Sequence, residues 1–183
     1  MRKNLGAKPC LYPQPVLIIG TYNEDGVPNA MNAAWGGICG ANKIIIDLSS
    51  HKTTDNILRN KEFTVSIADK EHMIAADYVG LVSANNVPDK LEKAGFHTVK
   101  SGFVNAPIIE ELPIALECRL IEATEHGIVG EIINASVDER VINEDGSLNT
   151  EKLEAISFDT MNAAYLLVGG KVGNAFSDGK KLM

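Results

Sequence analysis

Ser49-Ser50-His51-Lys52-Thr53-Thr54-Asp55-Asn56-Ile57, at residues 49–57, joins the end of an apolar stretch to the start of a helix. The apolar stretch, Ile44 to Leu48, contains three consecutive isoleucines and is typical of a buried strand. The residues after it combine hydroxyls with a lysine and a histidine at the expected helix N-terminus. Unpaired backbone N–H groups and the helix dipole attract anions there. The stretch therefore predicts a strand, a turn that binds a phosphate, and a helix.

A second interpretation of this stretch stays open. Thr53 and Thr54 are also residues of a type that caps its own helix, and such a cap needs no ligand. The residue types alone do not choose between a phosphate site and a plain helix cap.

Toward the N-terminus, the sequence predicts a β-hairpin. Residues 16–22 are apolar and β-branched, and the Asn-Glu-Asp-Gly that follows at 23–26 is typical of a tight turn, because glycine adopts positive φ at low cost. The return strand is expected from Pro28 to about Trp35. Its side chains are unusually small, which would let a flat ligand approach the backbone closely.

The rest of the chain continues the pattern of strands with short helices between them. Further strands are expected at 43–49, 62–68, 114–123, 128–141 and 165–176, and short helices at 53–60, 69–78, 89–94 and 150–156. Strands and helices do not alternate regularly, which argues against a doubly wound parallel sheet. We expect one domain, residues 1–183, built as a closed or nearly closed antiparallel barrel, since closure removes exposed strand edges.

Composition excludes several classes of protein. The formal charge of −7 argues against nucleic acids and anionic membrane surfaces as partners, and no apolar run is long enough to cross a membrane. The first residues are polar, as expected for a protein without a secretory signal. Cys10, Cys39 and Cys118 are widely separated, which indicates free thiols in the cytoplasm and no metal site.

Two nucleotide-binding motifs are absent. Residues 173–181 resemble a P-loop, but one residue too many separates the glycines, and Lys181 stands where serine or threonine is required. No G-x-G-x-x-G is present, so no Rossmann dinucleotide site is expected.

His126 is the one histidine of interest, because it lies at a turn between two long predicted strands. Simple exposure to solvent is the alternative for this residue.

Several separate motifs, taken in order, resemble one known family, the flavin reductase-like, FMN-binding split-barrel family, and its flavoredoxin-type members in particular. The resemblance extends over nearly the whole chain. The motifs are Tyr12-Pro13-x-Pro15-Val16, the run from Asn29 to Gly37, the turn at 49–57, Asp77-Tyr78-Val79-Gly80-x-Val82-Ser83, His126-x-Ile128-x-Gly130-Glu131-Ile132, and Gly170-Lys171-Val172-Gly173-x-Ala175-Phe176-Ser177.

The resemblance implies a mainly β fold, a six-stranded antiparallel split β-barrel of Greek-key type with short flanking helices. It also implies a homodimer with one FMN per subunit near the dimer interface. In such proteins the small-residue strand lies against the flavin ring, and the strand-to-helix turn holds the ribityl chain and phosphate. His126 matches a family histidine near the flavin or its hydride donor. The implied FMN-binding residues are Asn32, Ala33, Ala34, Trp35, Ser49, Ser50, Lys52, Thr53, Thr54, Asn56, Lys171 and Phe176.

The expected function is therefore that of an FMN-dependent oxidoreductase. It would pass electrons from NAD(P)H, bound transiently, or from a redox protein partner to flavin or another acceptor. A cofactor that carries the redox chemistry fits a chain without conspicuous catalytic side chains. Two alternatives stay open: an electron-transfer flavoprotein without nicotinamide activity, and a flavin-binding module without turnover.

Overall fold

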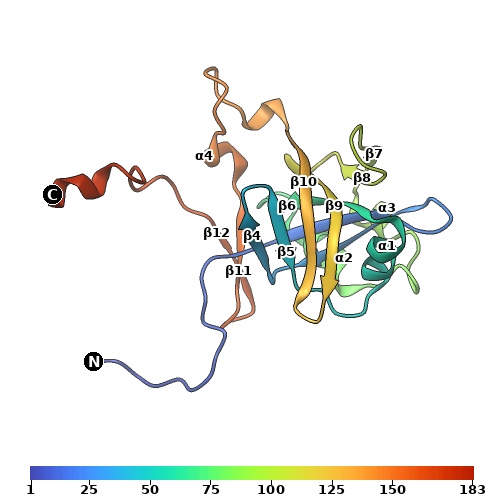
Figure 1. Cartoon of the computed structure of the whole chain (residues 1–183), viewed down its shortest axis with the longest axis horizontal. Coiled ribbons are helices and arrows are strands. Elements are labelled where there is room, and N and C mark those ends of the chain that lie inside the picture. The colour runs from blue at the N-terminus through green and yellow to red at the C-terminus, as the bar shows by residue number, and fades with distance from the viewer.

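A computed structural model describes all 183 residues. Its centre is a curled antiparallel sheet of seven strands in the order β3-β2-β6-β9-β10-β5-β4 (Figure 1). The strands of this sheet are β2 (Leu17–Tyr22), β3 (Pro28–Ala33), β4 (Gly36–Gly40), β5 (Lys43–Ile46), β6 (Glu62–Ile67), β9 (Ile114–Thr124) and β10 (Gly127–Val137). The mainly β split-barrel class expected from the sequence is confirmed.

Two smaller sheets and four short α-helices complete the fold. β1 (Gln14–Pro15), β11 (Ile156–Asp159) and β12 (Ala164–Leu167) form one small sheet, and β7 (Thr98–Lys100) pairs with β8 (Pro107–Ile109). The α-helices are α1 (Lys52–Asn60), α2 (Met73–Leu81), α3 (Lys90–Ala94) and α4 (Thr150–Leu153), and two short 3-10 helices lie at Glu139–Val141 and Asp178–Leu182.

Two apolar clusters hold the sheet in place. The first lies within the curl of the sheet and includes Leu17, Ile19, Ile46 and the completely buried Phe63. The second packs α2 and α3 onto the other side of β2 and includes Ile18 and Val79. Adjacent residues of β2 thus enter different clusters, as the alternation of side chains along a strand requires.

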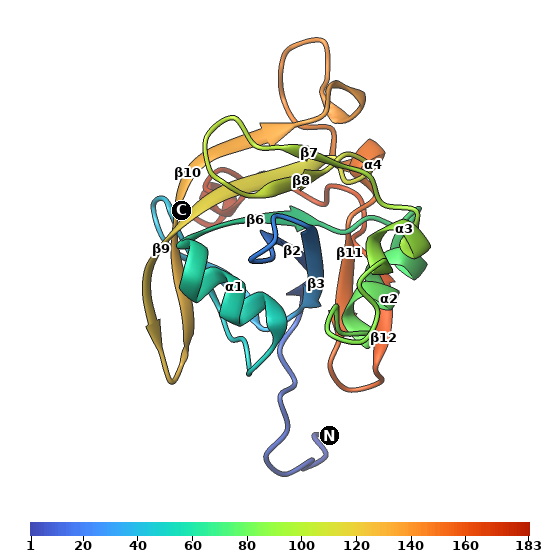
Figure 2. The same cartoon turned by 90° about the vertical axis from the view of Figure 1, so that its right-hand side faces the viewer.

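β3 ends the sheet on one side and pairs only with β2. Its other edge therefore carries backbone N–H and C=O groups without a strand partner. α1 and α2 lie on either side of this strand (Figure 2). The fold thus leaves a polar strand edge between two helices.

The strand count differs from the six expected, because the chain forms another strand after the return strand ends at Ala33. It turns at Ala34-Trp35 and continues as β4, which pairs with β5 as a second hairpin. The helix expected at 150–156 ends at Leu153, and Ile156 begins β11. The strand expected at 165–176 ends at Leu167, and the residues beyond it leave the body as an extended arm (Figure 1). No helix of the structure is long and apolar enough to cross a bilayer.

Candidate functional site

Three adjoining hollows follow the outer edge of β3. The first, about 260 Å³, lies between the start of α1 and the end of α2. The second, about 270 Å³, lies beside β11 and β12, and the third, about 150 Å³, lies beside the turn after β5. Asn32 lines all three. We call these three hollows together the β3 groove.

The start of α1 forms one wall of the groove. His51 occupies the N-cap position in an extended conformation, yet no side chain there accepts a hydrogen bond from the helix backbone. Thr54 donates its hydroxyl to the Ser49 carbonyl at 2.7 Å, and Thr53 accepts a hydrogen bond from the Asn29 amide at 2.8 Å. Both threonines therefore serve neighbouring groups and leave the first N–H groups of the helix uncapped. An uncapped helix start of this kind favours an anion.

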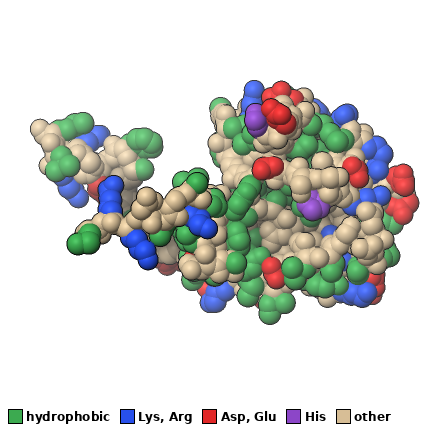
Figure 3. Space-filling view, turned by 90° about the horizontal axis from the view of Figure 1, so that it is seen from below, with side chains coloured by type: hydrophobic (Ala, Val, Ile, Leu, Met, Phe, Trp, Pro, Cys, Tyr) green, Lys and Arg blue, Asp and Glu red, His purple; other side chains and the backbone are tan.

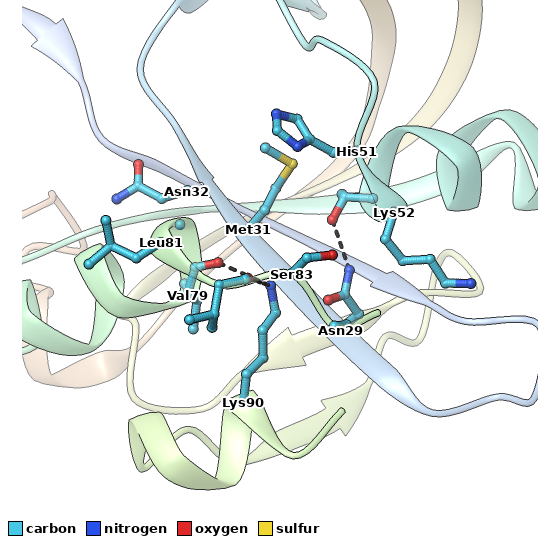
Figure 4. Close-up of a pocket in the computed structure, with 13 residues that line it drawn as sticks. Asn29, Met31, Asn32, His51, Lys52, Val79, Leu81, Ser83 and Lys90 are labelled. Carbon is cyan, nitrogen blue, oxygen red and sulfur yellow. Dashed lines mark hydrogen bonds between the residues drawn. The ribbon is translucent and has the colours of Figure 1, made fainter. Parts of the chain in front are cut away.

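Two lysines add positive charge at this end of the groove. Lys52 lies in the first turn of α1, and Lys90 rises from α3 on the opposite side (Figure 4). The Lys90 side chain is buried, and its Nζ donates to the carbonyls of Val79 and Val82, at 3.0 Å each. Burial lowers the pKa of Lys90 to about 8, because a charged ammonium loses solvation there. Nothing in the pattern around Lys90 identified it in advance, since its burial depends on how α3 packs against α2.

Asn29 carries an unused acceptor at the same end of the groove. The residue is 1% exposed, and its side-chain Oδ1 has no hydrogen-bond partner. Buried polar atoms without partners are rare in folded proteins and are costly. A ligand hydroxyl in the groove would supply the missing donor.

The other end of the groove is aromatic. The rings of Trp35 and Phe158 lie 6.1 Å apart, and those of Phe158 and Tyr165 lie 6.0 Å apart. The Tyr165 hydroxyl donates to Asp77 at 2.7 Å. Burial and that carboxylate raise the pKa of Tyr165 to about 12, which keeps the phenol protonated. The small side chains of Ala33 and Ala34 lie between this aromatic cluster and the charged end.

The structure brings most of the expected FMN-binding residues to this groove. Seven of them line it: Asn32, Ala33, Ala34, Trp35, Ser49, Lys52 and Thr53. Ser50 and Thr54 belong to the same turn but do not line the groove. Four further residues that line the groove were not expected from the sequence. They are Asn29, Lys90, Phe158 and Tyr165, which all lie outside the turn at 49–57.

Asn56 does not line the groove in this structure, and its part in FMN binding stays a prediction. Its amide nitrogen donates to Thr21 and Asn23, and its oxygen accepts from Arg59. Asn56 lies one turn beyond Lys52, on the face of α1 that packs against the β2–β3 hairpin. All its polar atoms are satisfied there.

The expected residues His126, Lys171 and Phe176 lie apart from the groove within one chain. His126 is at the tip of the β9–β10 hairpin with its side chain 81% exposed. Its neighbour Gly127 packs tightly against Ile46 and Asp47, and Asp47 lines the third hollow. Lys171 and Phe176 lie on the arm after β12, so one chain does not bring them to its own groove.

The comparisons with known proteins agree with this architecture. Residues 10–155 match the family described as "Flavin reductase like domain". Flavoredoxin of Desulfovibrio vulgaris (Miyazaki F) has a TM-score of 0.94 and 37% identity, over 98% of this chain and all of that one. Flavoredoxin from Methanosarcina acetivorans has a TM-score of 0.86 and 29% identity, over 100% and 98% of the two chains.

A more distant structure shares the fold alone. It is an FMN-binding domain of a flavin reductase-like enzyme from Shewanella baltica OS155, with a TM-score of 0.79 and 18% identity over 88% of this chain and 89% of that one. The match of residues 10–155, together with the full-length likeness to flavoredoxin, leads to one conclusion: this chain is a member of the flavin reductase-like family, with the split-barrel fold.

Proposed function

We propose that this protein binds FMN in the β3 groove and uses it as an oxidoreductase of the flavin reductase or flavoredoxin type. One observation carries the proposal. A single groove has an uncapped, cationic helix start at one end and a small-residue strand edge with aromatic walls at the other. This arrangement suits an elongated ligand with a phosphate at one end and a flat ring at the other.

Different groups of the protein would bind the phosphate, the ribityl chain and the ring of FMN along the groove. The first N–H groups of α1, with Lys52 and Lys90, would hold the phosphate. Asn29 Oδ1 would accept a hydrogen bond from a ribityl hydroxyl. The free edge of β3 near Asn32 would offer backbone groups to the ring, while Trp35 and Phe158 exclude water from it. Bound FMN supplies the hydride and electron chemistry, and the protein supplies position and charge.

The proposed donor is NAD(P)H or a reduced redox protein, and the acceptor is flavin or another small acceptor. His126 is proposed to act near the donor, since the hairpin that carries it adjoins Asp47 at the groove. The proposed assembly is a homodimer in the cytoplasm. The three free thiols, Cys10, Cys39 and Cys118, fit a reducing compartment.

An anaerobic titration tests the function. The FMN-loaded protein is mixed with NADH or NADPH, and the flavin absorbance is followed. Prompt bleaching by a nicotinamide is the expected result. Bleaching only by a reduced protein partner would favour the electron-transfer flavoprotein that the flavoredoxin likeness also suits. A protein that takes up no FMN would contradict the whole proposal.

Binding is tested separately from turnover. FMN and riboflavin are titrated into the flavin-free protein, with quenching of flavin fluorescence as the readout. Because the cationic end of the groove acts on the phosphate alone, FMN should bind more tightly than riboflavin. Equal affinities would contradict the phosphate assignment.

A further inference from the structure

We propose that a hollow at the end of α1 opposite the β3 groove is a second ligand site, which binds a nucleoside phosphate. The hollow has a volume of about 470 Å³ and lies between the β2–β3 turn, the last turn of α1 and the β7–β8 hairpin. Figure 2 shows the β2–β3 hairpin pointing toward the viewer, with α1 to one side and β7 and β8 above it. The hollow shares no lining residue with the β3 groove, so the two sites are separate.

Arg59 is fixed at the wall of this hollow with part of its guanidinium unused. Its Nε donates to Asn60 Oδ1 at 3.1 Å. Its Nη2 donates to the Tyr22 carbonyl at 3.0 Å and to Asn56 Oδ1 at 2.9 Å. Because a guanidinium has five N–H groups, these bonds leave both N–H groups of Nη1 without a partner in the protein. A planar cation held in one orientation is preorganised to bind an oxyanion.

The positive charge at this hollow is not neutralised by a carboxylate. Arg119 and Arg140 each form an ion pair, whereas Arg59 forms none. Lys100, on β7, also lines the hollow; it is exposed, and its amine has neither an ion pair nor a hydrogen bond. In a chain with a formal charge of −7, two unpaired cations at one hollow indicate an anionic ligand.

The rest of the lining suits a sugar and a base. Glu24, at the β2–β3 turn, has no hydrogen-bond or ionic partner, and a carboxylate is the group that binds ribose hydroxyls in dinucleotide sites. Tyr22 contributes an aromatic ring, on which a base can stack. The volume lies within the range of small-molecule sites and exceeds what a free phosphate fills.

A macromolecular partner is matched less well to this end of the molecule. Figure 3 shows acidic and basic side chains together at the end of the body away from the arm, which is the end that carries the β2–β3 hairpin in Figure 1. The acidic chain would repel a nucleic acid. Only one of the eight lining residues is hydrophobic, so the hollow offers little to anchor a protein partner.

Calorimetric titration with AMP, adenosine and inorganic phosphate tests the site. The protein is first saturated with FMN, so that the β3 groove is filled. We expect one AMP to bind per chain. Adenosine and phosphate should each bind at least about tenfold more weakly, because each lacks part of the contacts. The inference is overturned if AMP shows no saturable binding, or if adenosine or phosphate binds as tightly as AMP.

Two matched variants locate the bound AMP. Lys100→Gln removes an amine without a partner, so the variant should fold normally and bind AMP about tenfold more weakly. Lys43→Gln, on β5, makes the same change in net charge away from the hollow and should leave AMP affinity unchanged. Equal losses in the two variants would show attraction by overall charge alone and would also overturn the inference.

Arg59→Lys separates geometry from charge. It keeps one positive charge but loses the planar group with its two free N–H groups, and it should also weaken AMP binding. Unchanged AMP affinity in this variant would contradict the role given to Arg59. All three variants should keep wild-type FMN affinity, since none of the three residues lines the β3 groove. A negative result here therefore leaves the FMN titrations to decide the proposed function.

Discussion

Replacing Asn29 by leucine should raise stability and lower FMN affinity together. Asn29 is buried, its Oδ1 has no partner, and its amide nitrogen donates to Thr53. A buried acceptor without a partner costs about 1–3 kcal/mol, whereas one neutral hydrogen bond contributes about 0.5–1.5 kcal/mol. Leucine has a similar volume, and it removes both the unpartnered acceptor and the hydrogen bond to Thr53. The flavin-free variant should therefore be more stable than the wild type, by up to about 2 kcal/mol.

The effect on the ligand has the opposite sign. Bound FMN would donate a ribityl hydroxyl to the unused oxygen, and leucine offers no acceptor. Loss of that hydrogen bond should weaken FMN binding about tenfold, equivalent to about 1.4 kcal/mol. Urea denaturation of the flavin-free protein measures the first effect, and fluorescence titration with FMN measures the second.

Ser66→Ala provides the matched control. Ser66 is also buried with an unpartnered side-chain oxygen, but it lies on β6 and does not line the groove. Its replacement should not weaken stability and should leave FMN affinity unchanged. Full FMN affinity in Asn29→Leu, or a flavin-free variant that is less stable than the wild type, would contradict the role given to the unpartnered oxygen.

Three further predictions follow from the groove. Lys52→Ala should reduce FMN affinity and leave riboflavin affinity unchanged, while Lys61→Ala, at the other end of α1, should change neither; an equal loss for both ligands would count against a phosphate contact. Because the pKa of Lys90 is about 8 instead of its ordinary 10.5, Lys90 loses its charge at a lower pH than an ordinary lysine does. FMN affinity should therefore fall above pH 8, whereas stability should rise between the two pKa values, since the unfolded chain binds more protons there. Lys90→Gln should abolish that decline in FMN affinity, measured by titration across pH 7–10. His126→Ala should slow flavin reduction in stopped-flow measurements at near-normal FMN content; an unchanged rate would make His126 an ordinary exposed turn residue.

The β hairpins and the charged turn could be predicted from the sequence, because their signals are local. Asp25-Gly26 specifies a tight turn through the backbone of glycine, and Gly26 has a φ of 81°. The isoleucines before residue 49 and the hydroxyls after it mark the end of a strand and the start of a helix over a few positions. Seven of the expected binding residues line one groove for the same reason: they come from two short, continuous segments.

The parts that could not be predicted depend on distant contacts. Lys90 is a surface residue by type, and only the packing of α3 against α2 buries it. Phe158 reaches Trp35 because β11 returns to β1 from more than 100 positions away in the sequence. Asn56 has a suitable residue type and position, but its face of the helix turns toward the β2–β3 hairpin. Residue type and spacing do not reveal which face of a short helix packs against the sheet.

The free edge of β3 has a consequence for the protein before it acquires its cofactor. An uncovered strand edge is a template onto which an unrelated strand can add, and this is a common first step toward aggregation. A ligand bound along that edge would block such mispairing. The flavin-free protein would then be more prone to aggregate than the FMN-bound protein.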